Sequence, residues 1–300
     1  MSVDAEIRNA AFKRAAALNS QWSGTIPWQE VINPIKVGNE EVLLANRARG
    51  IFRPRQMRQG VLSIKTTVAR EGRVQRYDDV ASDAGFFEYR FQGTDPNNHD
   101  NRALKESWDN QLPFIYFHGV CAAFYSALFP CFIESWDAAA LTVRVVVGAV
   151  TSAIPAVQMS EDLRRYSTIE AKVRLHQAAF RGLVLSAYDN KCAISGLPER
   201  RLLQAAHILP DRDVRGQPVA NNGIALSSLH HHAFDLNLIG IDPDGCIHVN
   251  RDLLELHDGP TLQVALQNID QKRIRFPIAH EDKPNRDYLA ERFEQFVKAA

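Results

Sequence analysis

The pattern of hydrophobic and polar positions has a helical period in some parts of the chain and is typical of β-strands in others. An amphipathic helix that covers a sheet is predicted over residues 4–18, where apolar residues recur at helical spacing: Ile7, Ala11, Phe12, Ala15 and Leu18. The pattern then changes to short β-type runs, at 42–44, 62–67, 86–91, 114–117, 129–133 and 141–147. Because turn residues separate these runs, they predict a curved sheet or a small barrel.

Helical spacing returns after residues 148–161, where the β-pattern stops. Apolar residues from Ile169 to Ala187 predict a helix that leads into a second domain. The other side of this helix carries basic residues, which form either a phosphate-binding stripe or an ordinary solvated face: Arg164, Arg165, Lys172, Arg174 and Arg181. We therefore predict an α+β protein with two domains, residues 1–155 and residues 156–300.

Two further elements are predicted near the C-terminus. Residues 238–241 and 246–249 flank the turn sequence Asp242-Pro-Asp-Gly245, which predicts a hairpin. Residues 286–298 predict a last helix.

The densest group of reactive side chains lies between Ala205 and Asp235. His207 closes a short apolar run, and Asn222 follows 15 positions later in an Asn-Asn-Gly turn sequence. The intervening residues 211–222 are rich in Gly, Pro, Asp and Asn, which predicts a loop. His231 and Asp235 lie four apart, so a helix would place both on one face. The predicted order is therefore strand, loop, helix.

These residue types suit hydrolysis of a phosphodiester. A neutral imidazole accepts a proton near pH 7, so His207 is the candidate general base. An imidazole nitrogen and a carboxylate oxygen can share one divalent cation, which makes His231 and Asp235 candidate metal ligands. Of the three consecutive histidines at 230–232, only His231 stands four before Asp235. Asn222 is predicted to support the loop that presents the base, or to be a plain turn residue.

The segment from 168 to 255 resembles the HNH, or ββα-metal, endonucleases. The resemblance rests on Cys192-Ala-Ile-Ser-Gly196, Ala205-Ala-His-Ile208, Asn222-Gly223, and the run from Leu229 to Asp235 followed by Leu238-Ile-Gly-Ile241. It implies that His207 is the general base and that one ion, Mg²⁺ or Mn²⁺, is bound at each HNH site.

The sequence departs from the common HNH pattern at two points. Ala206 stands where many members have an acidic residue or His as a further metal ligand, so water, phosphate, Asp211 or Asp213 would have to complete the metal shell. Many members also carry paired CxxC motifs for zinc, whereas Cys192 is followed three positions later by Ser195. We therefore expect no structural zinc.

Residues 76–101 resemble the modified-cytosine pocket of SRA domains, which lies in a PUA-like barrel. The shared features are Tyr77 with nearby Asp79, Gly85 before two phenylalanines, Tyr89, and the pair Asp100-Asn101. The resemblance implies that Tyr77, Asp79 and Tyr89 bind a modified base that is flipped out of the duplex. The alternative is a β-hairpin whose aromatic residues fill a barrel.

Composition limits how the chain can bind a polyanion and where in the cell it is expected. The chain has 35 basic and 35 acidic residues, so a polyanion must be bound through local clusters rather than net charge. Cysteines 121, 131, 192 and 246 have no regular close spacing, and the N-terminus lacks the form of a secretory signal. Residues 141–157 are apolar but interrupted, too short for a membrane span. We expect a cytoplasmic protein without membrane contact.

Taken together, these patterns predict a modification-dependent restriction endonuclease that acts on double-stranded DNA as a homodimer. Three alternatives remain open. The first is an HNH endonuclease that reads unmodified sequence, and the second is a toxin-type nuclease with little specificity. The third is a modified-DNA binding protein that no longer cleaves.

Overall fold

The protein is a mixed α+β molecule with two compact units, residues 1–179 and 180–300. The structure is a computed structural model that describes residues 2–68, 85–148, 160–257 and 259–299, apart from the side chain of Arg164. The contact-based division falls inside helix α5 (Glu161–Ala187). The predicted domain boundary, between residues 155 and 156, lies outside the described residues and stays a prediction.

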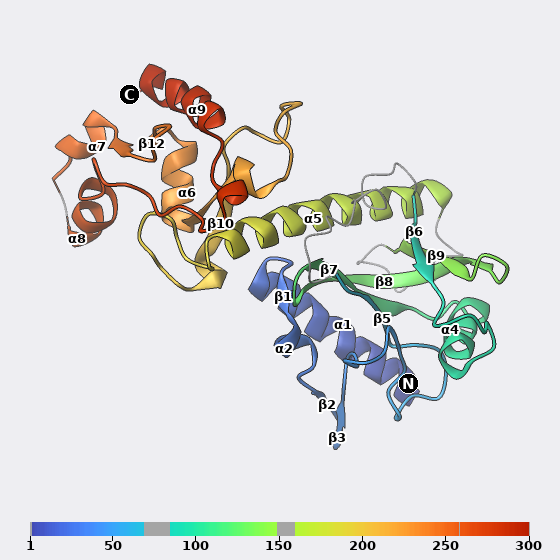
Figure 1. The fold of residues 1–300 in the computed structure, drawn as a ribbon. Coiled ribbons are helices and arrows are strands. Elements are labelled where there is room, and N and C mark those ends of the chain that lie inside the picture. Colours follow the sequence, from blue (N-terminus) through green and yellow to red (C-terminus); the bar gives the residue numbers. More distant parts are fainter. Residues whose placement is uncertain (1, 69–84, 149–159, 258, 300) are drawn as a thin grey trace. The chain divides into compact units, whose positions relative to one another are not determined.

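The first unit combines one larger sheet with helices (Figure 1). Its described strands are β1 (Ile26–Pro27), β2 (Ile35–Val37), β3 (Glu40–Val42), β4 (Ile51–Phe52), β5 (Ser63–Thr66), β6 (Phe87–Arg90), β7 (Phe114–Cys121), β8 (Phe124–Asp137) and β9 (Thr142–Val147). Its described helices are α1 (Val3–Trp22), α2 (Trp28–Val31), α4 (His99–Asp109) and most of α5.

The larger sheet has the order β4-β5-β7-β8-β9-β6, and β1 pairs with β8. Only β5 and β7 run parallel among its described pairs; the others are antiparallel. No described ladder joins the end strands β4 and β6, so the sheet is a curled half-barrel within the described residues. Five of the predicted β-runs overlap β5, β6, β7, β8 and β9, whereas the run 42–44 shares only Val42 with β3. A PUA-like or SRA-like barrel stays a prediction.

Alternation along β7 assigns the two faces of the sheet. Phe114 and Tyr116 belong to the core shared with α4 and α5, and Ile115 and Phe117 belong to the core shared with α1. This division follows from the two-residue period of a strand. The sheet therefore lies between two apolar layers.

Helix α1 confirms the predicted opening helix and extends it to Trp22. Its N-terminus is capped by Ser2, whose side chain accepts a hydrogen bond from the Ala5 amide. Its buried apolar face covers the sheet. The helix ends at Ser23, which has a left-handed backbone with φ 48°.

Helix α5 does not present the uniform basic stripe that its sequence suggested. Lys172 is buried, with Nζ 5.4 Å from the ring centroid of Phe87. Arg181 is also buried, and its guanidinium donates hydrogen bonds to the carbonyls of Arg200 and Leu203 at 2.8 and 3.0 Å. These two cations hold the fold together and do not lie on a solvated face.

The second unit contains two short hairpins and several helices. Its strands are β10 (Leu203–His207), β11 (Gly223–Ser227), β12 (Ile239–Ile241) and β13 (Ile247–Val249). Its helical segments, besides the end of α5, are η2 (Arg200–Leu202), η3 (Ala220–Asn222), α6 (Ser228–Asp235), α7 (Arg251–Glu255), α8 (Pro260–Leu262), η4 (Gln263–Gln267), η5 (His280–Asp282) and α9 (Arg286–Ala299). The predicted hairpin after the motif and the last helix are confirmed by β12, β13 and α9. Within the described part of the chain, no helix has the length and apolar character needed to cross a bilayer.

Candidate active site

The candidate site is built on a hairpin that leads into a helix. Strand β10 pairs antiparallel with β11, and His207 is opposite Gly223 at the end of the ladder. Residues 208–222 form the connection, and α6 starts directly after β11. The order is thus strand, loop, strand, helix, and it places His207 at the loop end of the hairpin.

His207 lies half-buried against an aromatic ring. Its imidazole stacks on Phe180 of α5, with ring centroids 3.9 Å apart and planes inclined by 16°. A glycine at position 223 permits this approach, because a Cβ there would lie 2.9 Å from Cζ of Phe180. The stack fixes the plane of the imidazole, which is what a base needs in order to face one water molecule.

Asn222 is fully buried and bonded to backbone groups. Its Oδ1 accepts from the Leu209 amide at 3.0 Å, and its Nδ2 donates to the carbonyls of Leu209 and Gln217 at 3.1 and 3.2 Å. These bonds tie both ends of the loop together beside His207. The side chain therefore acts on loop conformation in this structure.

Helix α6 carries the three consecutive histidines into different surroundings. Ser227 caps the helix by accepting from the His230 amide at 3.3 Å. His230 is buried: its Nε2 donates to the Ala265 carbonyl at 2.9 Å, and its Nδ1 faces the Ser227 hydroxyl and the Cys192 thiol at 2.9 and 3.4 Å. His232 is exposed. His230 is thus committed to packing, which leaves His231 half-buried beside Asp235.

His231 and Asp235 form a pair in which a neutral imidazole faces a carboxylate. Nε2 of His231 lies 3.3 Å from Oδ2 of Asp235, and Nδ1 of His231 lies 2.6 Å from Oε1 of Gln204. Burial lowers the pKa of His231 and the neighbouring His232 lowers it further, whereas Asp235 acts in the opposite direction. A neutral imidazole that donates through Nδ1 to Gln204 turns the lone pair of Nε2 toward a carboxylate oxygen.

Two such acceptors fit a shared cation. Ligand atoms with metal bonds of about 2.1 Å lie roughly 3.0–3.4 Å apart at octahedral or tetrahedral angles. The 3.3 Å separation of Nε2 and Oδ2 falls in this range. Gln204 fixes the tautomer of His231 that leaves Nε2 available, as partners of metal-binding histidines do. The residues present therefore fit a divalent ion.

Arg292 of α9 holds the other end of α6. Its guanidinium donates to the Phe234 carbonyl and to Asn237, and it lies 4.4 Å from the ring centroid of Phe234. Burial lowers the pKa of Arg292, and Asp235 raises it. A cation at the C-terminal carbonyls of a helix is favourable, so Arg292 stabilises the helix end that carries Asp235.

The two acids considered for the remaining ligand positions are both exposed or half-exposed. Asp213 is paired with Arg215 through Oδ2 at 2.9 Å, and hydrogen bonds from Arg215 lower its pKa. Asp211 is exposed. Ala206 is buried and offers no ligand atom.

Three positioning residues were not found from the sequence. Phe180, Gln204 and Arg292 each contact a candidate residue or its helix from a distant part of the chain. Gln204 carried only a weak signal, as a polar residue between the apolar residues Leu203 and Ala205 of β10. Phe180 and Arg292 lie in helical periods that indicate only packing.

The predicted base pocket is described in part. Tyr77 and Asp79 lie outside the described residues. Tyr89 of β6 is buried in the core, edge-on to Tyr116 with centroids 5.9 Å apart, and burial raises its pKa. Asn101 is buried in α4, and Asp100 pairs with Arg49 at 3.4 Å. The pocket stays a prediction.

Comparison with known proteins bears on the second unit. The profile of a family described as HNH endonuclease matches residues 192–242, which include β10, β11 and α6. This region is thus similar to a family of nucleases, which are hydrolases of nucleic acid. No curated protein matches the chain. A solved chain titled "Modification dependent TagI restriction endonuclease" has 14% identity and a TM-score of 0.30, covering 79% of this chain and 82% of that chain. A likeness at this TM-score carries no argument.

Proposed function

We propose that the protein is a metal-dependent HNH endonuclease that cleaves double-stranded DNA. The observation that carries this proposal is the 3.3 Å pair of His231 and Asp235, with Gln204 holding the imidazole tautomer, inside the region that matches the HNH family. His231 and Asp235 would hold one divalent ion, Mg²⁺ or Mn²⁺.

The residues divide the work of hydrolysis. When bound, the ion neutralises charge on the phosphate and near the departing oxygen. His207 takes a proton from the attacking water, with its ring held by the stack on Phe180. Asn222 keeps the loop closed beside the base through its three backbone bonds.

The first unit supplies specificity in this proposal. Tyr77 and Tyr89 sandwich a flipped modified cytosine, and Asp79 accepts from its exocyclic amine. The support is the sequence resemblance to SRA domains. The buried, edge-on position of Tyr89 instead favours the alternative in which this tyrosine fills the core and the protein reads unmodified DNA.

A digestion experiment tests both the metal-dependent cleavage and the preference for modified cytosine. Matched plasmids with unmodified, methylated or hydroxymethylated cytosine are incubated with wild-type protein and Mg²⁺ or Mn²⁺, with and without chelator. We expect cleavage of modified plasmid that needs the metal. His207→Ala should lower cleavage by at least about 10²-fold and leave DNA binding nearly intact, because a general base acts on the reaction rather than on affinity.

The variants distinguish the proposed nuclease site from the proposed modified-cytosine reader. Undiminished cleavage by His207→Ala and by His231→Ala would remove these residues from the active site, and no metal-dependent cleavage by wild-type protein would remove the nuclease assignment. Asp79→Ala should abolish the preference for modified plasmid but retain metal-dependent cleavage. Equal cleavage of all plasmids by wild-type protein would leave the nuclease in place and reject the modified-cytosine reader.

A further inference from the structure

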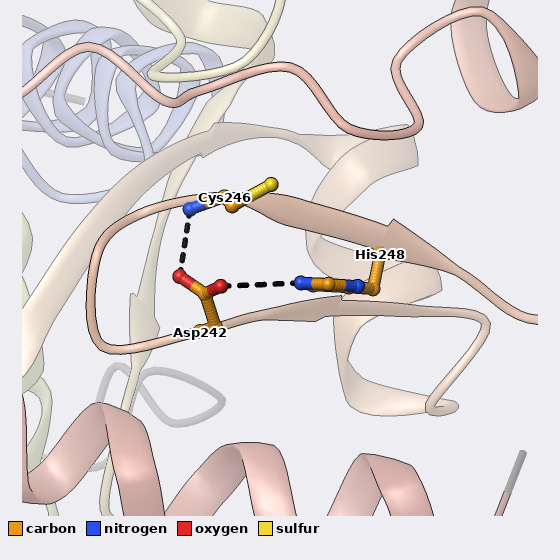
Figure 2. Close-up of side chains that lie close together, drawn as sticks. All are labelled: Asp242, Cys246 and His248. Carbon is orange, nitrogen blue, oxygen red and sulfur yellow. Dashed lines mark hydrogen bonds and ion pairs between the residues drawn. The ribbon is translucent and has the colours of Figure 1, made fainter.

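A second cluster of metal-ligating side chains lies outside the candidate active site, on the hairpin of β12 and β13. Asp242, Cys246 and His248 each offer one ligand atom, and these atoms lie within 4.8 Å of one another (Figure 2). The family match ends at Asp242, so it does not include Cys246 or His248. The cluster also shares no residue with the pair His231 and Asp235.

The backbone of the hairpin prepares Asp242. Its Oδ1 accepts from the amides of Asp244 and Cys246, both at 2.9 Å, while Oδ2 faces Nε2 of His248 at 3.2 Å. One oxygen is therefore used to fix the turn, and the other faces the cluster.

His248 and Cys246 are also held in place from outside the hairpin. The imidazole of His248 packs on Phe293, with centroids 4.9 Å apart. Segment 271–274 pairs with the hairpin through Gln271 N to Ile247 O and Ile274 N to Gly245 O, at 2.8 and 2.9 Å. This places the Gln271 amide 3.4 Å from Nδ1 of His248 and 3.9 Å from Sγ of Cys246.

We propose that Asp242, Cys246 and His248 bind a Zn²⁺-type transition-metal ion, with a fourth position open to water. The donor set of thiolate, imidazole and carboxylate suits zinc and disfavours Mg²⁺, which prefers oxygen ligands. Zinc bonds to nitrogen and oxygen of about 2.0–2.1 Å give a tetrahedral edge of roughly 3.3 Å. The 3.2 Å between Nε2 and Oδ2 matches that edge.

Binding changes the protonation of the cluster in a definite way. On binding, the Cys246 thiol would release its proton to solvent, and His248 would carry its one ring proton on Nδ1 instead of Nε2. A half-turn of the Gln271 amide then lets Oε1 accept from Nδ1, while Nε2 donates to the thiolate. Gln271 is thus a positioning residue that serves both states. The site is distinct from a CxxC zinc site, so the absence of paired cysteines in the sequence does not argue against it.

Cobalt provides a spectroscopic test on the full-length protein. The His231→Ala background removes the candidate nuclease ion, and Co²⁺ is titrated into reduced, metal-free protein. We expect one equivalent to produce a thiolate-to-cobalt charge-transfer band and strong visible bands, and Zn²⁺ to displace it. Cys246→Ser should abolish the charge-transfer band, and His248→Ala should weaken Zn²⁺ binding at least tenfold. Gln271→Ala should weaken it by about 10-fold or more.

Asp244→Asn is the matched control. Asp244 lies in the same turn, but its carboxylate pairs with Arg286 at 2.8 Å and is not a member of the ligand set. This variant should bind Co²⁺ as the parent does. Failure of the parent to bind Co²⁺ at micromolar concentration, or an unchanged charge-transfer band in Cys246→Ser, would overturn the proposal. Equal metal-free hydrogen exchange in Cys246→Ser and parent shows that the variant is folded, so loss of the band reports the ligand.

Discussion

The buried pair of Cys192 and His230 links one thiol to the fold of the candidate nuclease region. The Cys192 sulfur accepts from the amides of Ser195 and Ser227 at 3.5 and 3.2 Å and lies 3.4 Å from Nδ1 of His230. Burial alone would raise the pKa of Cys192, but these hydrogen bonds lower it to about 6. Burial likewise opposes the charged form of His230, whose pKa is nevertheless raised by Cys192 and by the Ala265 carbonyl.

The pKa shifts of Cys192 and His230 change the stability of the fold with pH in opposite directions. A lowered pKa means that Cys192 contributes stability in full above its ordinary value of 9.0, and this contribution is lost as the pH falls through about 6. The raised pKa of His230 contributes below its ordinary value of 6.5 and is lost as the pH rises through the raised value. The Cys192 contribution to the stability of the second unit therefore grows as the pH rises from about 6 to 9.0, while the His230 contribution falls above pH 6.5.

Cys192→Ser should make the second unit less stable near pH 8–9. The difference in free energy of unfolding between wild-type protein and this variant should decrease as the pH falls toward 6. All four tryptophans lie in the first unit, so hydrogen exchange of β10 and β11 is the suitable measurement. Cys131→Ser, followed by hydrogen exchange of β8 in the first unit, is the control, because burial raises the pKa of Cys131 and keeps this thiol neutral over the same pH range. A Cys192→Ser gap that stays constant from pH 9 to 6 would contradict the thiolate.

At the scale of elements, the contact between α5 and β11 positions His207, the candidate base. A Cβ on Gly223 would lie 2.3 Å from Cγ2 of Val184 and 2.9 Å from Cζ of Phe180. Glycine is required here by lack of space, since its φ of −136° suits any residue. The same approach brings Phe180 onto His207.

Gly223→Ala should therefore destabilise the second unit by about 1–3 kcal/mol, the usual cost of overpacking. It should also lower DNA cleavage, because Phe180 must move away from His207. Hydrogen exchange of β10 and a cleavage assay measure the two effects. The double variant Gly223→Ala, Val184→Ala provides room for the new methyl group and should recover part of both losses. A fully stable and active single variant would show that the contact is unimportant.

Helix α5 also shows how packing reassigns charged residues. Its sequence places five basic residues on one side, yet Lys172 and Arg181 are buried and serve the two cores. Conversely, Val173 belongs to the apolar series but is 52% exposed. One helix that contributes to both units cannot keep a single apolar face along 27 residues.

For the whole molecule, the number of sites limits the product. The chain has one candidate HNH site in its described residues, and one site hydrolyses one strand at a time. A double-strand break made in one binding event needs two sites that face opposite strands, and a symmetric dimer would supply them. The proposed nuclease should therefore act as a homodimer.

Sedimentation of the His207→Ala variant on a target duplex tests the oligomeric state without cleavage. We expect a complex of two chains per duplex. A mixture of wild-type and His207→Ala chains should produce nicked plasmid, because only one site of a mixed dimer is active. A strictly one-chain complex together with immediate linear product from wild-type protein would contradict the dimer.

Local patterns in the sequence determined much of this protein. The helical period predicted α1 and α9, and turn residues between apolar runs predicted the hairpin of β12 and β13. The spacing of four placed His231 and Asp235 on one face of α6, where the structure also has them 3.3 Å apart. These features depend on residues within one or two turns of each other, so a local rule is sufficient for them.

Tertiary structure alone decided which side chains complete the sites. Gln204 meets His231 across 27 positions, and Gln271 meets His248 across 23. The expectation of no structural zinc rested on the lack of paired cysteines, whereas a turn and the neighbouring segment 271–274 bring Asp242, Cys246 and His248 together. No periodicity encodes such contacts, because they depend on how separate elements pack. The sequence thus determined the candidate ligand pair His231 and Asp235. The packing of distant elements determined the tautomer of His231, the residues that hold α6 in place, and the second cluster.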